Sequence, residues 1–400
     1  MATDPPDERT APLNGITVVE LASNVAGPFA GVLLRDLGAR VIKIEHPARG
    51  DDVRGWPPFG RDHSAAFAAF NRGKESVALD IRTAAGQEAV LRIAASADVL
   101  LESMRPGKMD ALGLGSDVLC ELNPKLVYCS ISGFGRRGPR GGEAGFDAIV
   151  QAYSGLMDLT GHITGPPARV GTGVIDEGAG LWAALGVVAA LASRGVTGNG
   201  CRVESTLLGA ASGLMMHHIA SVTMASHVPE RAGTAQHNTA PYEAIFAQDA
   251  PVMIGVTNQS LWERVGEALD CEELIGDPRF RTNADRVANR TELIQLLSGA
   301  ISHLTAAEVA QKLRTAGVPS SEIRGIGDLP GDEQVIAMEL IQPIESGERL
   351  PVSPVMFDGN PASLSGLQIP EIGSSTDMVL REVGYDDESM ADLRNSGSIR

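Results

Sequence analysis

The sequence is poor in several features that define common classes of protein. Its 400 residues contain four cysteines and only 4% aromatic residues. The cysteines lie far apart and form no Cys-x-x-Cys pair, which excludes the usual redox motif. Because they also lie in apolar surroundings, we expect reduced core residues of a cytoplasmic protein: Cys120, Cys129, Cys201 and Cys271.

Three short catalytic motifs are absent as well. The chain has no Gly-x-x-x-x-Gly-Lys-Ser/Thr loop, no Gly-x-Ser-x-Gly elbow and no His-Glu-x-x-His pair. These absences exclude the common nucleotide hydrolases, serine hydrolases and zinc proteases. The neighbours His217 and His218 point to different faces of a predicted helix, so we expect no metal site. Residues 1–12 are polar and contain three prolines, and we expect a frayed tail rather than a signal peptide.

Positive charge is scarce, and it is unevenly distributed along the chain. The formal net charge is −17, which disfavours nucleic acid as a general partner. Residues 1–145 nevertheless contain 17 Lys and Arg against 18 Asp and Glu, whereas the remainder contains 16 against 32. The N-terminal third therefore has the cations to bind a small anionic ligand.

Length and composition indicate a globular protein of two domains. Four hundred residues exceed one ordinary domain, and 43% hydrophobic with 21% charged residues is typical of a folded soluble protein. A polar linker with proline and glycine around 226–238 marks the first boundary. We predict a large domain over 1–225, completed by 329–400 because that segment is short for an independent domain, and a smaller α+β domain over 226–328.

The first half of the chain alternates strands and helices. Strands are predicted from β-branched and apolar runs at 16–21, 40–45, 76–80, 98–102, 126–132 and 201–206. With helices between them, this pattern predicts a doubly wound α/β domain with a Rossmann-like parallel sheet. Binding sites in such sheets lie at the carboxyl ends of strands, here the loops 22–25, 46–49, 103–107 and 133–142.

One of these loops matches a dinucleotide-binding pattern. Residues 133–138 have the spacing Gly-x-Gly-x-x-Gly, but Pro139 follows where a helix should begin, so we do not interpret them as a dinucleotide site. A cationic loop over an anionic ligand and an ordinary surface loop are equally open interpretations. The cations of the turn 71–74, Arg72 and Lys74, are expected to be solvated.

The stretch around Asp176 is where we expect the chemistry. The uncharged apolar run 179–193 can form a helix buried on every face, and at about 15 residues it is too short to span a bilayer. A carboxylate just before a helix faces unpaired N–H groups and the positive end of the helix dipole, which favour its ionised form. Asp176 would then be a poor general acid but a suitable nucleophile. Helix capping is the commoner role for such a residue.

Six motifs lie between residues 26 and 147: Ala26-Gly27-Pro28, Gly38-Ala39-Arg40-Val41-Ile42-Lys43-Ile44-Glu45, Ala97-Asp98-Val99-Leu100-Leu101-Glu102, Arg105-Pro106-Gly107, Gly133-Phe134-Gly135 and Gly145-Phe146-Asp147. In this combination the sequence resembles the family III CoA-transferases, which include formyl-CoA transferase, the carnitine CoA-transferases and the related 2-methylacyl-CoA racemases. The resemblance implies a transferase of sulfur-containing groups (EC 2.8.3) that moves CoA from an acyl-CoA donor to a carboxylic acid.

The resemblance also assigns a role to Asp176, because its position matches the catalytic nucleophile of the family. The implied intermediates are an acyl-aspartyl anhydride and an aspartyl-CoA thioester, and capping becomes secondary. The alternative is a 2-methylacyl-CoA racemase or epimerase, which needs two proton-transfer groups. Racemases have His at the position of Phe146 and Glu at that of Ala247, and neither a phenyl ring nor a methyl group relays a proton.

For CoA binding, the family's positions fall on Asn24, Val25, His46, Lys74, Ser103, Met104 and Ala111. Formyl-CoA transferase has arginine at two of them, His46 and Ala111, so phosphate contacts are expected instead from Arg105, Lys108, Arg136 or Arg137. The glycine-rich segment that formyl-CoA transferase folds over its active site has no counterpart between Val228 and Tyr242, which argues against oxalate as the acceptor.

The resemblance implies an architecture and a set of partners too. Two chains would form an interlocked-ring homodimer, each threading through the other. CoA and acyl-CoA would be substrates, with no permanently bound cofactor and no metal. Neither nucleic acid nor a membrane is expected as a partner.

Overall fold

The computed structural model describes residues 11–400, so most of the predicted frayed tail lies outside the described residues. The chain divides into two compact units. The described part of the large unit comprises 11–154, 170–216 and 330–400, and the small unit comprises 155–169 and 217–329. The first boundary thus falls at 216, not at the predicted 225, because helix α10 (Met216–Ala225) buries none of its residues.

Six parallel strands form the central sheet of the large unit: β1 (Thr17–Leu21), β2 (Arg40–Glu45), β3 (Glu75–Ala78), β4 (Val99–Glu102), β5 (Val127–Ser132) and β6 (Arg202–Thr206). Their order is β3-β2-β1-β4-β5-β6, and every neighbouring pair is parallel. This is the strand order of a doubly wound fold, so the predicted α/β class with a parallel sheet is confirmed. The order reverses between β1 and β4, where such folds bind ligands.

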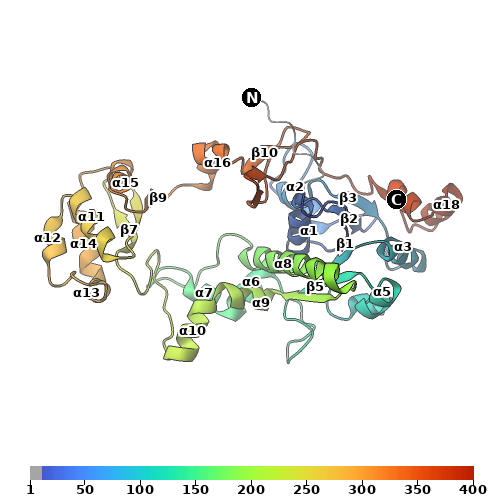
Figure 1. The fold of residues 1–400 in the computed structure, drawn as a ribbon, viewed down its shortest axis with the longest axis horizontal. Helices are drawn as coiled ribbons and strands as arrows, with labels where there is room; N and C mark the ends of the chain where they lie inside the picture. Colours follow the sequence, from blue (N-terminus) through green and yellow to red (C-terminus); the bar gives the residue numbers. More distant parts are fainter. Residues whose placement is uncertain (1–10) are drawn as a thin grey trace. The chain divides into compact units, whose positions relative to one another are not determined.

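Helices cover both faces of this sheet (Figure 1). One face packs against α3 (Ala84–Ala95), α5 (Ser116–Leu122), α17 (Thr376–Glu382) and α18 (Asp387–Asn395). The other face carries α1 (Ala26–Asp36), α8 (Val174–Thr197) and α9 (Leu207–Leu214). Strands β1 to β5 are mostly buried as a result, which explains the apolar sequences of β1 and β4, whereas Arg202 and Glu204 of the edge strand β6 are exposed.

Helix α8 differs from the helix that the apolar run predicted. It spans 24 residues and begins before the run, so Asp176 is its third residue. Its buried positions are mostly small residues, whereas Leu181, Trp182 and Leu185 are 57%, 45% and 55% exposed. The expectation of burial on every face is therefore wrong, because only the face with small residues packs closely against the large unit.

The prediction that this helix is too short to span a bilayer is also wrong, because α8 has 24 residues. Among the described residues it is the one single helix long and apolar enough to cross a bilayer, and α9 with α10 would qualify only as a bent pair. Length and composition are weak indications, because core helices of soluble proteins share them. Only 39% of the apolar window is buried within the chain.

The small unit is an α+β structure with a three-stranded antiparallel sheet in the order β7-β8-β9: β7 (Tyr242–Phe246), β8 (Pro251–Gly255) and β9 (Ser320–Glu322). Its helices are α11 (Gln259–Ala268), α12 (Glu272–Gly276), α13 (Asn283–Ala288), α14 (Arg290–Ala300) and α15 (Ala306–Thr315). Its core surrounds the fully buried Trp262.

Short elements complete the chain: the 3-10 helices η2 (Asp52–Gly55) and η3 (Ile326–Gly331), the helices α2 (Ala65–Asn71), α4 (Lys108–Ala111), α6 (Asp147–Ser154), α7 (Leu156–Leu159) and α16 (Glu333–Ala337), and the strands β10 (Ile341–Pro343), β11 (Arg349–Pro351), β12 (Met356–Phe357) and β13 (Asn360–Pro361). The cysteines are free, as expected, but Cys201 is exposed because it precedes the edge strand β6. Cys120 is half-buried, so only Cys129 and Cys271 are core residues.

Candidate active site

A cavity of about 260 Å³ lies at the carboxyl ends of strands β1 to β4. Its floor is apolar, with Leu21, Ile44 and Leu79 among its lining residues. The structure brings four predicted CoA-binding residues together in this lining: His46, Ser103, Met104 and Lys108. Parallel sheets bind ligands at the carboxyl ends of their strands, and this strand-end rule therefore locates the pocket. Apolar and cationic side chains are among its lining residues.

The same cavity is lined by two arginines that the sequence analysis missed, Arg49 and Arg82. Arg82 lies 2.9 Å from Nε2 of His46 and forms an ion pair of 2.7 Å with Asp80. Hydrogen bonds from Arg82 lower the pKa of Asp80 to about 2. The sequence could have indicated both arginines. Arg49 is the last residue of the loop 46–49, which was predicted to lie at the carboxyl end of a strand, and Arg82 lies in the loop that follows β3.

Asn24 and Val25 form the turn between β1 and α1, directly after the cavity residue Ser23. Asn24 has φ 65°, a left-handed conformation that asparagine tolerates better than most residues. The backbone N–H of Ser23 donates to Oγ of Ser103 at 3.3 Å, which ties this turn to the end of β4. The turn therefore lies at the point where the strand order reverses.

A close approach between α1 and β1 depends on glycine. A methyl group added at Gly27 would lie 2.2 Å from Cβ of Ala22, far inside van der Waals contact. At Gly31, one turn later, it would lie 2.0 Å from a carboxylate oxygen of Glu20. The glycines thus let α1 begin directly above the strand ends and above a buried carboxylate.

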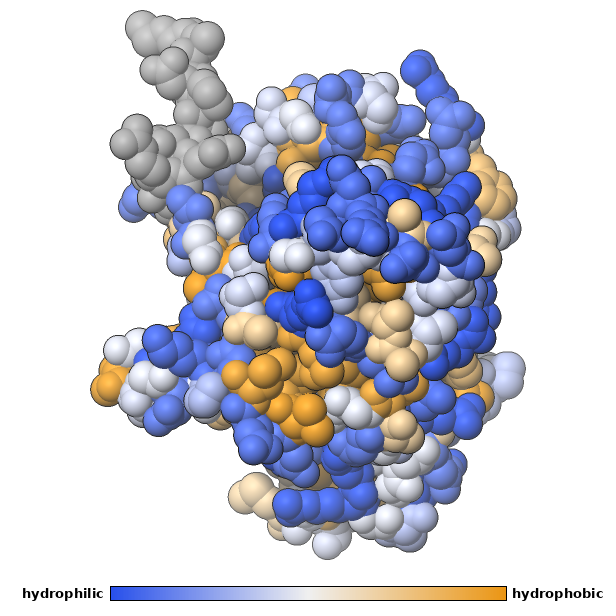
Figure 2. Space-filling model, turned by 90° about the vertical axis from the view of Figure 1, so that its right-hand side faces the viewer, coloured by the Kyte–Doolittle hydropathy of each residue, from blue (hydrophilic) through white to orange (hydrophobic). Residues whose placement is uncertain are grey.

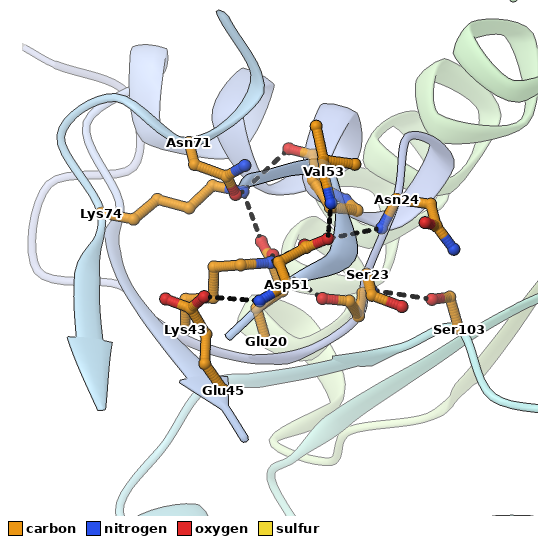
Figure 3. A network of polar contacts seen from close by, with 12 residues as sticks. Glu20, Ser23, Asn24, Lys43, Glu45, Asp51, Val53, Asn71, Lys74 and Ser103 are labelled. Atoms are coloured by element: carbon orange, nitrogen blue, oxygen red, sulfur yellow. Dashed lines mark hydrogen bonds and ion pairs between the residues drawn. The ribbon is translucent and has the colours of Figure 1, made fainter. Parts of the chain in front are cut away.

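The structure gives Lys74 a role that is different from the predicted one (Figure 3). Its side chain is fully buried, and Nζ donates to Glu20 Oε2 at 2.7 Å, to Pro28 O at 2.9 Å and to Asn71 Oδ1 at 3.0 Å. All three ammonium hydrogens are used inside the protein, and Lys74 is not part of the cavity lining. Arg72 is buried against Asp36 at 2.5 Å, so neither cation of this turn is solvated.

Glu20 is shared by two buried lysines. Lys43 Nζ donates to Glu20 Oε1 at 2.8 Å and pairs with Asp51 at 2.9 Å, while Lys74 holds the other oxygen of Glu20. Burial would raise the pKa of Glu20, but Lys43 and Lys74 outweigh it and lower the pKa. Burial lowers the pKa of Lys74 to about 8, because the attraction of Glu20 offsets the effect of burial only in part. Burial would also lower the pKa of Lys43, but Glu20 and Asp51 raise it above its usual value.

The remaining predicted cations lie outside the cavity lining. Arg136, in the loop after β5, pairs with Asp110 at 3.3 Å and with Glu204 at 3.7 Å. Arg105 and Arg137 are exposed. Of the four predicted phosphate-binding cations, the structure places only Lys108 in the cavity. No group of three or more His, Cys, Asp and Glu residues within 11–400 is arranged to hold a metal ion.

The N-terminus of α8 is organised by a second aspartate, which the sequence analysis did not assign. Gly173 occupies the cap position, and Asp147 of α6 accepts hydrogen bonds from the N–H groups of Ile175 at 2.8 Å and Asp176 at 3.4 Å. Gln151 donates to the other oxygen of Asp147 at 2.7 Å. The cap is therefore supplied by Asp147, and the predicted N-cap role of Asp176 is wrong.

The position of Asp176 relative to α1 follows from the packing of the two helices. A methyl group at Gly180 would lie 2.5 Å from the carbonyl oxygen of Ala26, the first residue of α1. Residues four apart share one face of a helix, so Asp176 and Gly180 point to the same side of α8. The side of α8 that contains Asp176 and Gly180 therefore faces the start of α1, which follows the turn with Asn24 and Val25.

The cavity lies where the strand order reverses, which is where doubly wound sheets bind ligands, and both cations such as Arg49 and Arg82 and carboxylates such as Asp52 line it. The chain belongs to CoA-transferase family III, whose family model matches residues 13–376. The resemblance found in the sequence motifs is thereby confirmed.

Two relatives illustrate the similarity. The chain is 34% identical over 396 residues to human succinyl-CoA:glutarate CoA-transferase, with 97% of this chain and 90% of the relative covered. It is 36% identical over 371 residues to the acetyl-CoA:oxalate CoA-transferase of Acetobacter aceti, with 92% and 93% covered.

Solved structures show the same fold. A CAIB/BAIF family protein from Brucella suis superposes with a TM-score of 0.84 at 35% identity, covering 93% of this chain and 99% of that protein. A hypothetical protein from Mycobacterium tuberculosis gives 0.83 at 29% identity, covering 92% and 99%.

Proposed function

We propose that this protein is a CoA-transferase that moves CoA from an acyl-CoA donor to a free carboxylic acid. The observation that carries the proposal is the place of Asp176, in the first turn of α8 beside the β1–α1 turn. Partial positive charge at a helix N-terminus favours a carboxylate there, and an ionised carboxylate is the form that attacks a thioester. The relatives quoted above are named as CoA-transferases with succinyl-CoA or acetyl-CoA as donors.

The proposed reaction proceeds through two covalent states of Asp176. Its carboxylate attacks the carbonyl carbon of the acyl-CoA, and CoA leaves as thiolate, giving an acyl-aspartyl anhydride. The thiolate then attacks the aspartyl carbonyl and releases the donor acid, giving an aspartyl-CoA thioester. The acceptor carboxylate attacks this thioester and receives CoA by the reverse sequence, which regenerates Asp176.

The adenosine end of CoA would occupy the cavity at the strand ends. Its apolar floor suits a purine, and the cations on its rim suit phosphate groups: His46, Arg49, Arg82 and Lys108. Asn24 and Val25 would lie along the path from the cavity to Asp176. Arg105, Arg136 and Arg137 remain candidates for contacts made by exposed loops.

The racemase alternative has less support. Phe146 is 64% exposed and carries no proton-transfer group. Ala247 follows β7 in the small unit and packs against its apolar core. A racemase would exchange the hydrogen at C2 of its substrate with solvent deuterium, and a transferase would not.

Incubation of the protein with a panel of acyl-CoA donors and carboxylic acids tests the proposed function. We expect at least one pair, with a dicarboxylic acid among the first to be tried, to give the exchanged acyl-CoA by mass spectrometry. Incorporation of deuterium at C2 without any exchange of CoA would support the racemase instead. Neither exchange nor deuterium incorporation with any pair would contradict the transferase function.

The exposed apolar face of α8 supports a homodimer, which we propose as an interlocked pair of chains. Leu181, Trp182 and Leu185 lie on this face, and Ile149 and Tyr153 of α6 are 53% and 52% exposed. Hydrophobic areas are also visible among the hydrophilic surface in Figure 2. Burial of such areas is the usual driving force of association. Sedimentation equilibrium of the pure protein should give twice the mass of 41.8 kDa, and a monomer at micromolar concentration would contradict the proposal.

The free cysteines support a cytoplasmic location. All four are free thiols in the structure, and we propose a cytoplasmic enzyme on that basis. Retention of all four thiols in protein isolated from cells with alkylation at lysis would support this, whereas a disulfide would not.

A further inference from the structure

Asp51 lies at the centre of the contacts that hold the β1–α1 turn. Its Oδ1 accepts hydrogen bonds from the backbone N–H groups of Asn24 at 3.1 Å and of Val53 at 3.1 Å. Its Oδ2 lies 2.9 Å from Nζ of the buried Lys43. Figure 3 shows this carboxylate between the turn at Asn24, the start of η2 and strand β2. One buried side chain thus joins three segments at the edge of the cavity.

The turn needs such support because its conformation is unfavourable without it. Asn24 is in the left-handed region, and Val25, the N-cap residue of α1, makes no side-chain capping hydrogen bond. A residue in this region is held there by its surroundings, and a hydrogen bond to an ionised acceptor is among the stronger ones. Asp51 itself is 4% exposed, and its two acceptor contacts on Oδ1 go to the backbone.

The charge of Asp51 is compensated within the protein. Lys43 is fully buried between Asp51 and Glu20, and Glu45 accepts a hydrogen bond from the N–H of Asp51 at 2.9 Å. Arg54 in turn pairs with Glu45 at 2.7 Å. Lys43 therefore holds the carboxylate of Asp51, and Glu45 holds its backbone N–H.

We infer that Asp51 is a positioning residue for the acyl-CoA substrate: it contacts the backbone of Asn24 and so fixes the β1–α1 turn against which the bound thioester lies. The inference rests on the proposed function. Lys43 assists through its ion pair with the second carboxylate oxygen of Asp51.

Three variants separate this role from a merely structural one. Asp51→Ala removes the acceptor for Asn24 N–H, and we expect the Kd for CoA and the KM for acyl-CoA to rise at least about tenfold with kcat changed less than about threefold. Asp51→Asn keeps an acceptor oxygen but removes the charge opposite Lys43, and we expect a Kd within about threefold of the wild-type value. Asp36→Ala is the matched control, because Asp36 is a buried carboxylate that pairs with Arg72 and accepts the N–H of Ser353 at 3.0 Å.

All three variants should have a lower melting temperature, because each removes a counter-charge from a buried cation, Lys43 or Arg72. Only Asp51→Ala should weaken CoA binding in calorimetric titrations with CoA. Equal affinities in Asp51→Ala and Asp36→Ala would overturn the inference, as would an Asp51→Asn protein that binds as weakly as Asp51→Ala. If Asp51→Ala does not fold, Asp51→Glu replaces it. Glutamate keeps the charge but displaces the acceptor oxygen, so weak binding supports the inference and normal binding overturns it.

The binding measurements also distinguish this inference from the proposed function. Wild-type protein that binds CoA but transfers none of it contradicts the transferase function alone, and the variants still test Asp51. Wild-type protein that does not bind CoA overturns both.

Discussion

Asp176→Asn should lower the rate of CoA transfer by about 10³-fold or more. The amide of asparagine is a poor nucleophile and cannot form the acyl anhydride from which the aspartyl-CoA thioester arises. The substitution leaves the backbone N–H of residue 176 in place, so its hydrogen bond to Asp147 and the start of α8 are kept. The measurement is the initial rate with the acyl-CoA and acid that the wild type accepts.

Glu177→Gln is the matched control for this prediction. Glu177 is the next carboxylate along α8 and accepts a hydrogen bond from Oγ1 of Thr172 at 3.1 Å. It points about 100° away around the helix, and its variant should keep a rate within about threefold of the wild type. Wild-type protein mixed with acyl-CoA should carry a CoA-sized mass on the peptide that contains Asp176. Transfer at nearly the normal rate by Asp176→Asn would rule out this nucleophile.

Glu20→Gln should lower the free energy of unfolding by about 3–5 kcal/mol. Glu20 is fully buried and is the shared counter-ion of Lys43 and Lys74, so its loss leaves two buried ammonium groups with insufficient negative charge. A glutamine at this position would also direct an N–H₂ group toward a lysine. Chemical denaturation followed by circular dichroism measures the difference.

Two further variants show whether the lower free energy of unfolding of Glu20→Gln comes from the buried charges. Glu88→Gln removes an exposed carboxylate that pairs with Arg92 at 2.9 Å, and its cost should not exceed about 0.5 kcal/mol. Adding Lys74→Met to Glu20→Gln removes one uncompensated charge and should restore at least about 1 kcal/mol. Equal costs for Glu20→Gln and Glu88→Gln would show that the buried network does not stabilise the fold.

The parallel sheet could be predicted because its strands are buried on both faces. The run 99–102 is apolar except for its last residue for that reason, and the observed strands begin and end within two residues of the predicted ones. The strand-end rule then located the cavity and four of its lining residues. Local patterns of hydrophobicity carry this information, so an isolated sequence is sufficient for it.

The pairing of charged side chains could not be predicted in the same way. Lys74 follows a glycine in a polar turn, which suggests solvent, yet its partner Glu20 lies 54 residues earlier in the chain. The capping of α8 by Asp147 likewise joins residues 28 positions apart. Such contacts depend on how strands and helices pack in three dimensions, and composition alone does not indicate them. The exposed face of α8 was missed because an uncharged run does not reveal which of its faces is covered.

Part of the edge strand β3 is held by residues about 300 positions later in the chain. The N–H of Ala78 donates to Oγ1 of Thr376, 298 residues later, and Leu79 forms a bridge with Ile399. During synthesis, this edge therefore stays unpaired while the whole small unit emerges and folds. An unpaired strand edge is a site where chains aggregate, so the nascent protein is vulnerable there until residues 376–399 have emerged. A message truncated shortly before codon 375 would make that vulnerable state permanent.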